Sequence, residues 1–598
     1  MKKQYKNIPK AILENNALSR RTFVTGLAAS GLFGAVSSQS FGASKQSFIA
    51  GRNFELSLGY REVNLTGIPR QATVVNEGLP GPVLRWKQGD NIRLSVKNNL
   101  AEDSSIHWHG IILPPGMDGV PDISFGGITP GGTFDYRFQV LQNGTYWYHS
   151  HSEFQEQTGL YGAIIIDPAE PYPYKFDREY VLLLSDWSDE KPENIFSRLK
   201  KESHYYNTNR RTLSDLTNQL SRVGPSATWN DRSMWNLMRM SDRDISDVTG
   251  ATYTFLFNGM TPDQNWTGLF SRGQKILLRV VNAAAMTFFD FRIPGLKMTV
   301  VAADGQYVEP VNVDEFRIGI AETYDVIIEP KEGAYSLFAQ AIDRSGYARG
   351  TLTEDSSLTA PIPDLDPSPV LSHIDMGMDM GMDMGMKDHS SSHTDHSKHS
   401  MSNNRHSMNH SVGSENSIGK AGFGSNAKIT HASSEFGFNV DMRADMPRKQ
   451  IGNPGIGFDN PARKVLSYSD LSNLYKSEVI QEPEREIQLH LTGNMKRYMW
   501  SFNGISFADA EPLKLKLNQR VRILLVNDTM MNHPIHLHGM WSELETGNPE
   551  RIPRKHTIVV QPGAKVSYLV TPEVSGSWAF HCHLLYHMMG MFRRVEVS

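Results

Sequence analysis

The sequence predicts an all-β fold built from three β-sandwich domains, and internal repeats are the first reason. Segments 129–151 and 561–583 align with each other without a gap, and segment 321–340 is a weaker third copy. Each copy consists of short stretches in which side chains alternate in polarity, separated by turns that contain Gly or Pro. Few stretches have a convincing helical pattern. Repeated short strands with few helices are typical of stacked β-sheets.

The copies set the expected domain boundaries. We expect sandwiches at 46–170, 171–349 and 440–598, because 598 residues suffice for several domains of roughly 100–200 residues each. Segment 190–248 has a partly helical pattern, so we expect it to be an insertion in the second domain.

Residues 350–439 form the predicted linker between the second and third domains. It contains a tract rich in Met, His and Ser at 363–411. Beyond its start this tract has almost no aliphatic residues and therefore cannot bury enough apolar surface to fold alone. We expect a flexible, disordered Met- and His-rich insertion.

Residues 1–45 are predicted to be an export signal. The stretch 19–23, SRRTF, is a twin-arginine signature, and a mildly apolar run and small residues follow it. That run is too short to span a bilayer, and no later stretch approaches the ~20 apolar residues of a spanning helix. We therefore predict Tat export of the folded protein to the periplasm, cleavage between Ser37 and Ser44, and no membrane span. An exposed amphipathic leader is the alternative.

Net charge and cysteine content limit the classes of function that the chain can have. The formal net charge of −4 lacks the strongly basic character of nucleic-acid-binding proteins. Cys582 is the only cysteine, so no internal disulfide can form, although exported proteins meet an oxidising compartment. A leftover thiol is a reactive liability there. We therefore expect Cys582 to belong to a functional site.

Four His-x-His pairs predict a metal site. Residues i and i+2 of a strand share one face, so each pair offers two imidazoles to one side. A lone pair is more often a satisfied surface or core pair, but four pairs in two matched domains indicate a multinuclear site. The pairs are His107 and His109, His149 and His151, His536 and His538, and His581 and His583.

Strand alternation sends the Cys582 thiol to the opposite face from His581 and His583. There we expect it to meet His533 and His587. One thiolate with two imidazoles and a weak thioether is the ligand pattern of a blue-copper electron-transfer centre. Zinc prefers four strong ligands, and iron–sulfur clusters need more thiolates than this chain has. A buried inert cysteine in a β core is the alternative.

The motifs HWHG, WYHSH, HPIHLHG and HCHLLYH resemble the four copper signatures of the multicopper oxidases, in the order of that family. The leader, the Met- and His-rich tract and two phrases at 109–125 and 253–268 are most similar to its periplasmic copper-resistance protein A branch. The resemblance covers the mature chain. It implies cupredoxin-like Greek-key sandwiches and four copper ions: one type 1, one type 2 and a type 3 pair.

The resemblance also implies a ligand set. The type 1 copper would be bound by His533, Cys582 and His587, and the type 2 copper by His107 and His536. The type 3 pair would be bound by His109, His149, His151, His538, His581 and His583.

Two further residues are implied with alternatives. Asp118 matches the family acid that hydrogen-bonds near the type 2 copper and helps deliver protons to oxygen. The alternative is a turn residue before Gly119. The family's axial Met position is Phe592 here, and Met591 lies one residue early. We expect Met591 to be the axial ligand, through a tightened turn at Gly590, and a weakly ligated or three-coordinate centre is the alternative.

The implied reaction is one-electron oxidation of a substrate coupled to four-electron reduction of O₂ to water. Thioethers at alternate positions of the tract select Cu(I), which favours a cuprous oxidase serving copper resistance. A laccase-like phenol oxidase shares every ligand and remains an alternative, as does a copper-sequestering protein. The tract is alternatively a tolerated insertion. A periplasmic or outer-membrane copper-handling protein is the expected partner.

Overall fold

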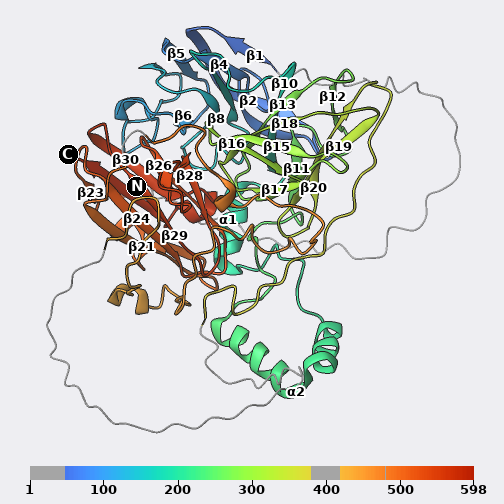
Figure 1. Cartoon of the computed structure of the whole chain (residues 1–598), viewed down its shortest axis with the longest axis vertical. Helices are drawn as coiled ribbons and strands as arrows, with labels where there is room; N and C mark the ends of the chain where they lie inside the picture. Colours follow the sequence, from blue (N-terminus) through green and yellow to red (C-terminus); the bar gives the residue numbers. More distant parts are fainter. Residues whose placement is uncertain (1–46, 379–417, 478–479) are drawn as a thin grey trace, which may run out of the picture. The chain divides into compact units, whose positions relative to one another are not determined.

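The computed structural model describes residues 47–378, 418–477 and 480–598. The predicted export signal and the greater part of the Met- and His-rich tract lie outside the described residues. Within them, strands form six sheets and helices are few, which confirms the all-β class. In Figure 1 these strands follow the chain in three groups, coloured blue, green, and orange to red.

Two sheets lie in the first predicted domain. One has the order β3 (Arg70–Val75), β2 (Asn53–Val63), β5 (Asn91–Asn98), β7 (Thr133–Gln139). The other has the order β1 (Phe48–Ala50), β4 (Val83–Lys87), β9 (Tyr161–Asp167), β8 (Gly144–His149), β6 (His107–His109). Strand β2 shows why the chain forms these sheets. Its Phe54, Leu56 and Leu58 are buried while the intervening residues are exposed, as expected for a strand with one solvated face.

The second predicted domain repeats this arrangement. One sheet has the order β11 (Tyr253–Phe257), β10 (Arg178–Ser188), β13 (Ile276–Asn282), β18 (Thr323–Ile328), β15 (Met298–Ala303), β16 (Gln306–Val313). The other has the order β12 (Trp266–Leu269), β20 (Tyr347–Thr353), β19 (Ala334–Ala341), β14 (Phe289–Arg292), β17 (Glu315–Ile318).

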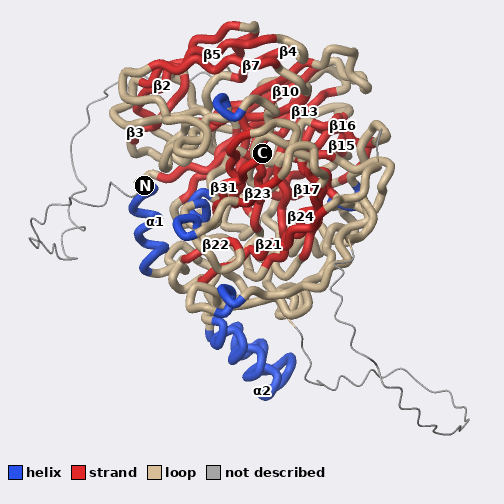
Figure 2. Tube along the Cα trace, turned by 90° about the vertical axis from the view of Figure 1, so that its left-hand side faces the viewer, coloured by secondary structure: helices blue, strands red, loops and turns tan. Residues whose placement is uncertain are grey.

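Two helices lie in the segment with the partly helical pattern, α1 (Pro192–Lys201) and α2 (Leu213–Met238). Helix α2 begins with a capping box between Thr212 and Asp215, and it is kinked at Gly224, where φ is +80°. Figure 2 shows α2 extending away from the strands.

The third domain has the same pair of sheets. One has the order β22 (Met499–Phe502), β21 (Arg485–Asn494), β24 (Val521–Asn527), β29 (Lys565–Val570), β26 (Ser542–Leu544), β27 (Arg554–Lys555). The other has the order β23 (Leu513–Leu515), β31 (Phe592–Val597), β30 (Gly576–Cys582), β25 (His533–Leu537), β28 (Thr557–Val560). The short helix α3 (Leu585–Met588) connects β30 to β31. The remaining helical turns are η1 (Pro115–Met117), η2 (Ser433–Phe436), η3 (Tyr468–Asp470) and η4 (Phe507–Asp509).

An asparagine at the end of one central strand marks the repeat in each domain. Asn98, Asn282 and Asn527 each donate two hydrogen bonds to backbone carbonyls and accept one from the backbone N–H two residues further on. This bonding satisfies the loop that leads to β6, β14 or β25. The loop therefore delivers the chain to an equivalent strand in each domain.

The predicted linker overlaps described chain at both ends. Strand β20 runs to Thr353, and Ala360, Leu371 and Met376 are buried. After the tract, the carbonyls of Gly419 and Lys420 accept hydrogen bonds from the buried Arg522. These ends therefore pack on the sandwiches through buried apolar side chains and backbone hydrogen bonds.

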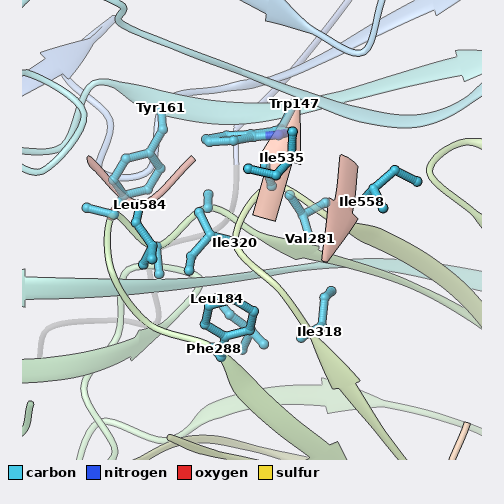
Figure 3. Packing of buried hydrophobic residues seen from close by; sticks show 14 of the residues in the cluster. Trp147, Tyr161, Leu184, Val281, Phe288, Ile318, Ile320, Ile535, Ile558 and Leu584 are labelled. Carbon is cyan, nitrogen blue, oxygen red and sulfur yellow. The ribbon is translucent and has the colours of Figure 1, made fainter. Parts of the chain in front are cut away.

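One hydrophobic core crosses the three predicted domains. Figure 3 shows Trp147 of the first domain beside Ile535 of the third, Tyr161 of the first beside Leu584 of the third, and Leu184 of the second domain in the same cluster. Continuous packing of this kind resists sliding of one sandwich against another. It therefore fixes the ends of β6 and β8 against the ends of β25 and β30, where the histidine pairs lie.

Candidate metal centres

Strand pairing brings the histidine pairs together. In the first domain His107 of β6 lies opposite His149 of β8. In the third domain His536 of β25 lies opposite His581 of β30. Directly opposed residues of an antiparallel pair point to the same face, so each strand pair presents imidazoles on one side. The second histidine of three pairs lies just beyond a strand end: His538 and His583 directly follow β25 and β30, and His151 lies two residues after the end of β8.

The eight imidazoles form three groups of three, with one shared member. Within each group the ligand atoms lie within 4.8 Å of one another. The groups are His107, His109 and His536; His109, His149 and His583; and His151, His538 and His581. The Nε2 atoms of His538 and His581 are 2.9 Å apart, and those of His149 and His583 are 3.4 Å apart.

The outer ring nitrogens of two of these histidines contact backbone carbonyl oxygens. His107 Nδ1 lies 2.8 Å from the Asp118 carbonyl, and His536 Nδ1 lies 2.6 Å from the His556 carbonyl. A carbonyl can only accept a hydrogen bond, so each Nδ1 carries the proton and each Nε2 lone pair faces inward.

The inward nitrogens fit a metal. Among the described residues, Nε2 of His107, Nε2 of His536 and both ring nitrogens of His109 have no hydrogen-bond partner. Buried polar atoms are rarely left so. Burial lowers the pKa of His109, His149 and His536 well below its usual value and that of His581 to about 3, so these rings are neutral. Neutral, buried, convergent imidazoles are a donor set for transition-metal ions.

Asp118 lies beneath this cluster. Its Oδ2 is 2.9 Å from His538 Nδ1, and its Oδ1 is 3.3 Å from His107 Nδ1. The side chain is buried at the end of the η1 turn. The next residue, Gly119, has φ of +80°, and a Cβ there would lie 1.8 Å from the Ile106 carbonyl oxygen. Asp118 is thus a turn residue and also contacts two histidines of the cluster.

A second buried acid, Glu156, is absent from the residues predicted above. Its Oε2 lies 2.8 Å from His149 Nδ1, and its Oε1 lies 4.0 Å from His583 Nδ1. Burial, with a smaller contribution from the charge of Asp186, raises the pKa of Glu156 well above its usual value. The only sequence signal is its position five residues after His151, in a turn with no periodicity.

Cys582 lies on the other face of β30, as alternation predicts. Its Sγ is 3.4 Å from His533 Nδ1 and 4.0 Å from His587 Nδ1, and these two nitrogens are 3.4 Å apart. All three side chains are buried, and burial raises the pKa of the Cys582 thiol and lowers those of both histidines. A metal ion that displaces the thiol proton fits between them.

The register between β30 and β31 gives Met591 and Phe592 different neighbours. Phe592 lies opposite His581, and their rings stack with centroids 5.3 Å apart. The Cys582 N–H donates to the Met591 carbonyl, 3.1 Å. Met591 directly precedes β31, so continued alternation along the chain would place its side chain on the side of Cys582, opposite to Phe592. Gly590 makes the turn: a Cβ there would lie 2.1 Å from the Trp500 carbonyl oxygen.

Comparisons with known proteins agree with this geometry. The Multicopper oxidase family models match residues 57–171, 178–357 and 481–598. Copper resistance protein A of Escherichia coli is 54% identical, covering 97% of this chain and 99% of that protein. Copper resistance protein A of Pseudomonas syringae pv. tomato is 52% identical, with the same coverage. The chain belongs to the multicopper oxidase family.

Solved structures of the family share the fold of this multicopper oxidase. Fet3p, described as a multicopper oxidase that functions in iron import, superposes with a TM-score of 0.62 at 18% identity and covers 92% of this chain and 91% of its own. The laccase from Botrytis aclada has a TM-score of 0.60 at 20% identity, covering 93% and 89%. Membership makes the chain an oxidoreductase that uses copper and O₂. No helix among the described residues is both long and apolar enough to cross a membrane.

The second domain covers the outer edge of His587 in this multicopper oxidase. The Nε2 of His587 lies 2.6 Å from Oδ2 of Asp247, a residue that follows α2, and the Tyr498 hydroxyl donates to the same oxygen. The Trp500 ring stacks on His587 with centroids 3.8 Å apart. All four side chains are buried. Sequence patterns cannot find Asp247, because it lies 340 residues from His587 along the chain.

Proposed function

We propose that this multicopper oxidase holds four copper ions and couples the oxidation of Cu(I) to the reduction of O₂ to water, in the service of copper resistance. The observation that carries the proposal is the position of Cys582. Its sulfur faces His533 and His587, while the adjacent His581 and His583 belong to the cluster of eight. One strand therefore connects the electron-accepting centre to the oxygen-reducing cluster through covalent bonds.

The proposed ligands follow the clusters. The type 1 copper would be held by His533, Cys582, His587 and Met591, and the type 2 copper by His107 and His536. The type 3 pair would be held by two groups, His109 with His149 and His583, and His151 with His538 and His581. When bound, these ions supply one-electron transfer and the storage of several electrons, so that oxygen can be reduced without release of partly reduced species.

The protein's own contribution is to orient and protonate. Asp118 is within reach of the imidazoles of His107 and His538, so it can hold both rings and pass protons towards the cluster. Phe592 and Trp147 stack on His581 and His149, which excludes water from two sides. Asp247 and Trp500 hold the His587 ring and fix its tautomer.

The covered edge of His587 favours a small reductant. Its side chain is fully buried, and Asp247 occupies its Nε2. A bulky phenol cannot touch the imidazole without displacing this segment, whereas a cuprous ion needs little room. The resemblance to proteins named copper resistance protein A supports the same substrate. Relatives of that name and the twin-arginine stretch also support export to the periplasm, where a copper-handling partner would meet it.

Side-by-side oxygen consumption tests the substrate. The copper-loaded protein is given Cu(I), and separately a phenol such as 2,6-dimethoxyphenol, with the Cys582→Ser protein as the background for spontaneous Cu(I) oxidation. We expect a higher kcat/KM for Cu(I). Faster turnover of the phenol would make the protein laccase-like. Copper binding far above four ions with no oxygen uptake would make it a sequestering protein.

A further inference from the structure

We propose a fifth metal site in the third domain, formed by His431, Glu435, His490 and Asp528 and selective for a borderline divalent ion such as Cu(II). The four residues come from three separate parts of the chain. His431 and Glu435 belong to the segment around η2, His490 to β21 and Asp528 to the turn after β24. Their ligand atoms all lie within 4.8 Å of one another.

The donor atoms converge on one point. His431 Nδ1 lies 2.7 Å from Glu435 Oε2 and 3.6 Å from Asp528 Oδ2. His490 Nδ1 lies 2.6 Å from Asp528 Oδ2 and 3.5 Å from Glu435 Oε2. Each imidazole nitrogen thus faces both carboxylates, and each carboxylate oxygen faces both imidazoles. This is the arrangement of a four-donor site rather than of two separate pairs.

The charges of the cluster differ from those of other buried acids in the domain. Glu435 and Asp528 are almost completely buried, with side chains 1% and 0% exposed. Among the described residues, neither forms a salt bridge with a lysine or arginine. By contrast, the buried Glu545 has the guanidinium of Arg522 at 2.7 Å. Two buried carboxylates facing each other need positive charge between them, and a divalent ion supplies it.

The donor types select the ion. Two imidazole nitrogens and two carboxylate oxygens suit Cu(II) and Zn(II), and among divalent ions such a site binds Cu(II) most tightly. Cu(I) prefers soft sulfur ligands, and Ca(II) and Mg(II) prefer oxygen alone. The site therefore takes the oxidised form of copper, and 18% exposure of the His431 side chain leaves one side open for entry.

One of the four residues lies close to a proposed type 1 ligand, so its substitution would not test the fifth site alone. Asp528 precedes Thr529, whose hydroxyl lies 2.7 Å from His533 Nε2. Substitution of Asp528 would therefore disturb the blue centre as well. His431 and Glu435 lie outside the proposed oxidase machinery, so His431→Gln and Glu435→Gln test the site alone.

Equilibrium dialysis of the copper-loaded full-length protein against buffered free Cu(II) tests the proposal. The parent, His431→Gln and Glu435→Gln proteins are compared with His204→Gln. His204 also pairs with a buried carboxylate, that of Asp244, and neither residue is one of the four donors of the proposed site. Copper bound by the Met- and His-rich tract is common to all four proteins and cancels. Retained blue colour reports that each variant is folded.

We expect the parent and His204→Gln to bind one more Cu(II) per chain than the two cluster variants at low free Cu(II). The variants should need at least about tenfold more free Cu(II), since even outer residues of metal sites cost 10–100-fold in affinity. Equal binding by the parent and His431→Gln, or an equal loss in His204→Gln, would overturn the proposal. Because only bound copper is counted, the result is independent of whether the enzyme oxidises Cu(I).

Crystals soaked in Cu(II) give a second measurement that does not depend on any variant. We expect an anomalous peak at the copper edge between His431 and His490. Absence of that peak at copper concentrations that keep the other centres filled would show a hydrogen-bonded network instead, and the site would be rejected.

Discussion

The same two strand positions carry different buried polar side chains in the second and third domains. β14 and β19 occupy the sheet positions of β25 and β30. In the second domain Asp290 of β14 forms ion pairs with two arginines: Nε of Arg317, on β17, lies 2.7 Å from Asp290 Oδ1, and Nη1 of Arg344, in the turn after β19, lies 2.7 Å from Asp290 Oδ2. In the third domain β25 and β30 carry His536 and His581, whose Nε2 atoms point into a shared space.

The difference shows how buried polar groups reveal function. The carboxylate of Asp290 has two arginines as partners, so its charge is compensated by residues of the chain itself. His536 Nε2 has no partner among the described residues, and its ring is neutral because burial lowers its pKa. Buried polar atoms without a partner are rare, and we propose that His536 Nε2 binds a metal. The same fold therefore carries a self-contained ion-pair network around Asp290 in the second domain and the proposed metal ligands in the third, although Asp247 of the second domain also reaches His587.

The largest effect should come from removing the thiol. Copper-loaded protein should be blue through charge transfer from Cys582, and Cys582→Ser should abolish the colour and turnover. Most copper of the eight-histidine cluster should stay bound, because none of its ligands changes. Absorption spectra, metal content and oxygen uptake measure this. A blue Ser variant would refute the assignment of Cys582.

Asp118→Asn should give the next largest effect. The amide keeps the size of the side chain but cannot pass a proton, and proton-transfer roles contribute ~10²–10⁴-fold. We expect oxygen reduction to slow by that order while substrate still reduces the blue centre at the parental rate. Stopped-flow bleaching and reoxidation separate the two steps. Unchanged turnover would leave Asp118 as a turn residue only.

Removing the Asp290 charge in the second domain should lower stability rather than activity. Asp290→Asn leaves Arg317 and Arg344 buried without their counter-charge, and breaking a buried pair costs about 3–5 kcal/mol. We expect a lower denaturation midpoint but the parental copper content and activity per copper at low temperature. If activity per copper also fell, Asp290 would not have a purely structural role, and its contrast with the histidines of the third domain would be wrong.

Acid should destabilise the copper-free protein through the histidines. The pKa of His581 is lowered to about 3 from 6.5 by burial, and that of His149 is also far below its usual value. Below pH 6.5 the unfolded chain therefore binds more protons than the folded one, and the free energy of unfolding falls as pH falls. We expect the urea midpoint to fall steadily from pH 6.5 to 4. Copper should delay the fall to lower pH, because protons must first displace it. A midpoint constant over this range in the copper-free protein would contradict the neutral-imidazole picture.

The histidine pairs and Cys582 could be predicted because their information is local. Alternation along one strand places His581 and His583 on one face and Cys582 on the other, whatever the rest of the chain does. The repeat likewise predicted all three sandwiches. Glu156, Asp247 and the His431 cluster could not be found this way. Their partners come from distant segments that turns and irregular chain bring together, and such segments have no periodic sequence pattern.

The smallest effect should come from deleting residues 379–410, the part of the tract that lies between the described ends. Thioethers there would hold Cu(I) weakly and release it once it is oxidised, because Cu(II) prefers harder ligands. Such sites raise the local concentration of substrate without changing the chemistry, so we expect kcat/KM for Cu(I) to fall by on the order of tenfold. Copper loading and blue colour should persist, since no proposed ligand lies in the segment. Turnover of a phenol should stay the same or rise. A variant in which every Met and His of the segment is replaced by Ser serves as the length-matched control. If the deletion oxidised Cu(I) as efficiently as the parent, the tract would be a tolerated insertion with no part in delivery.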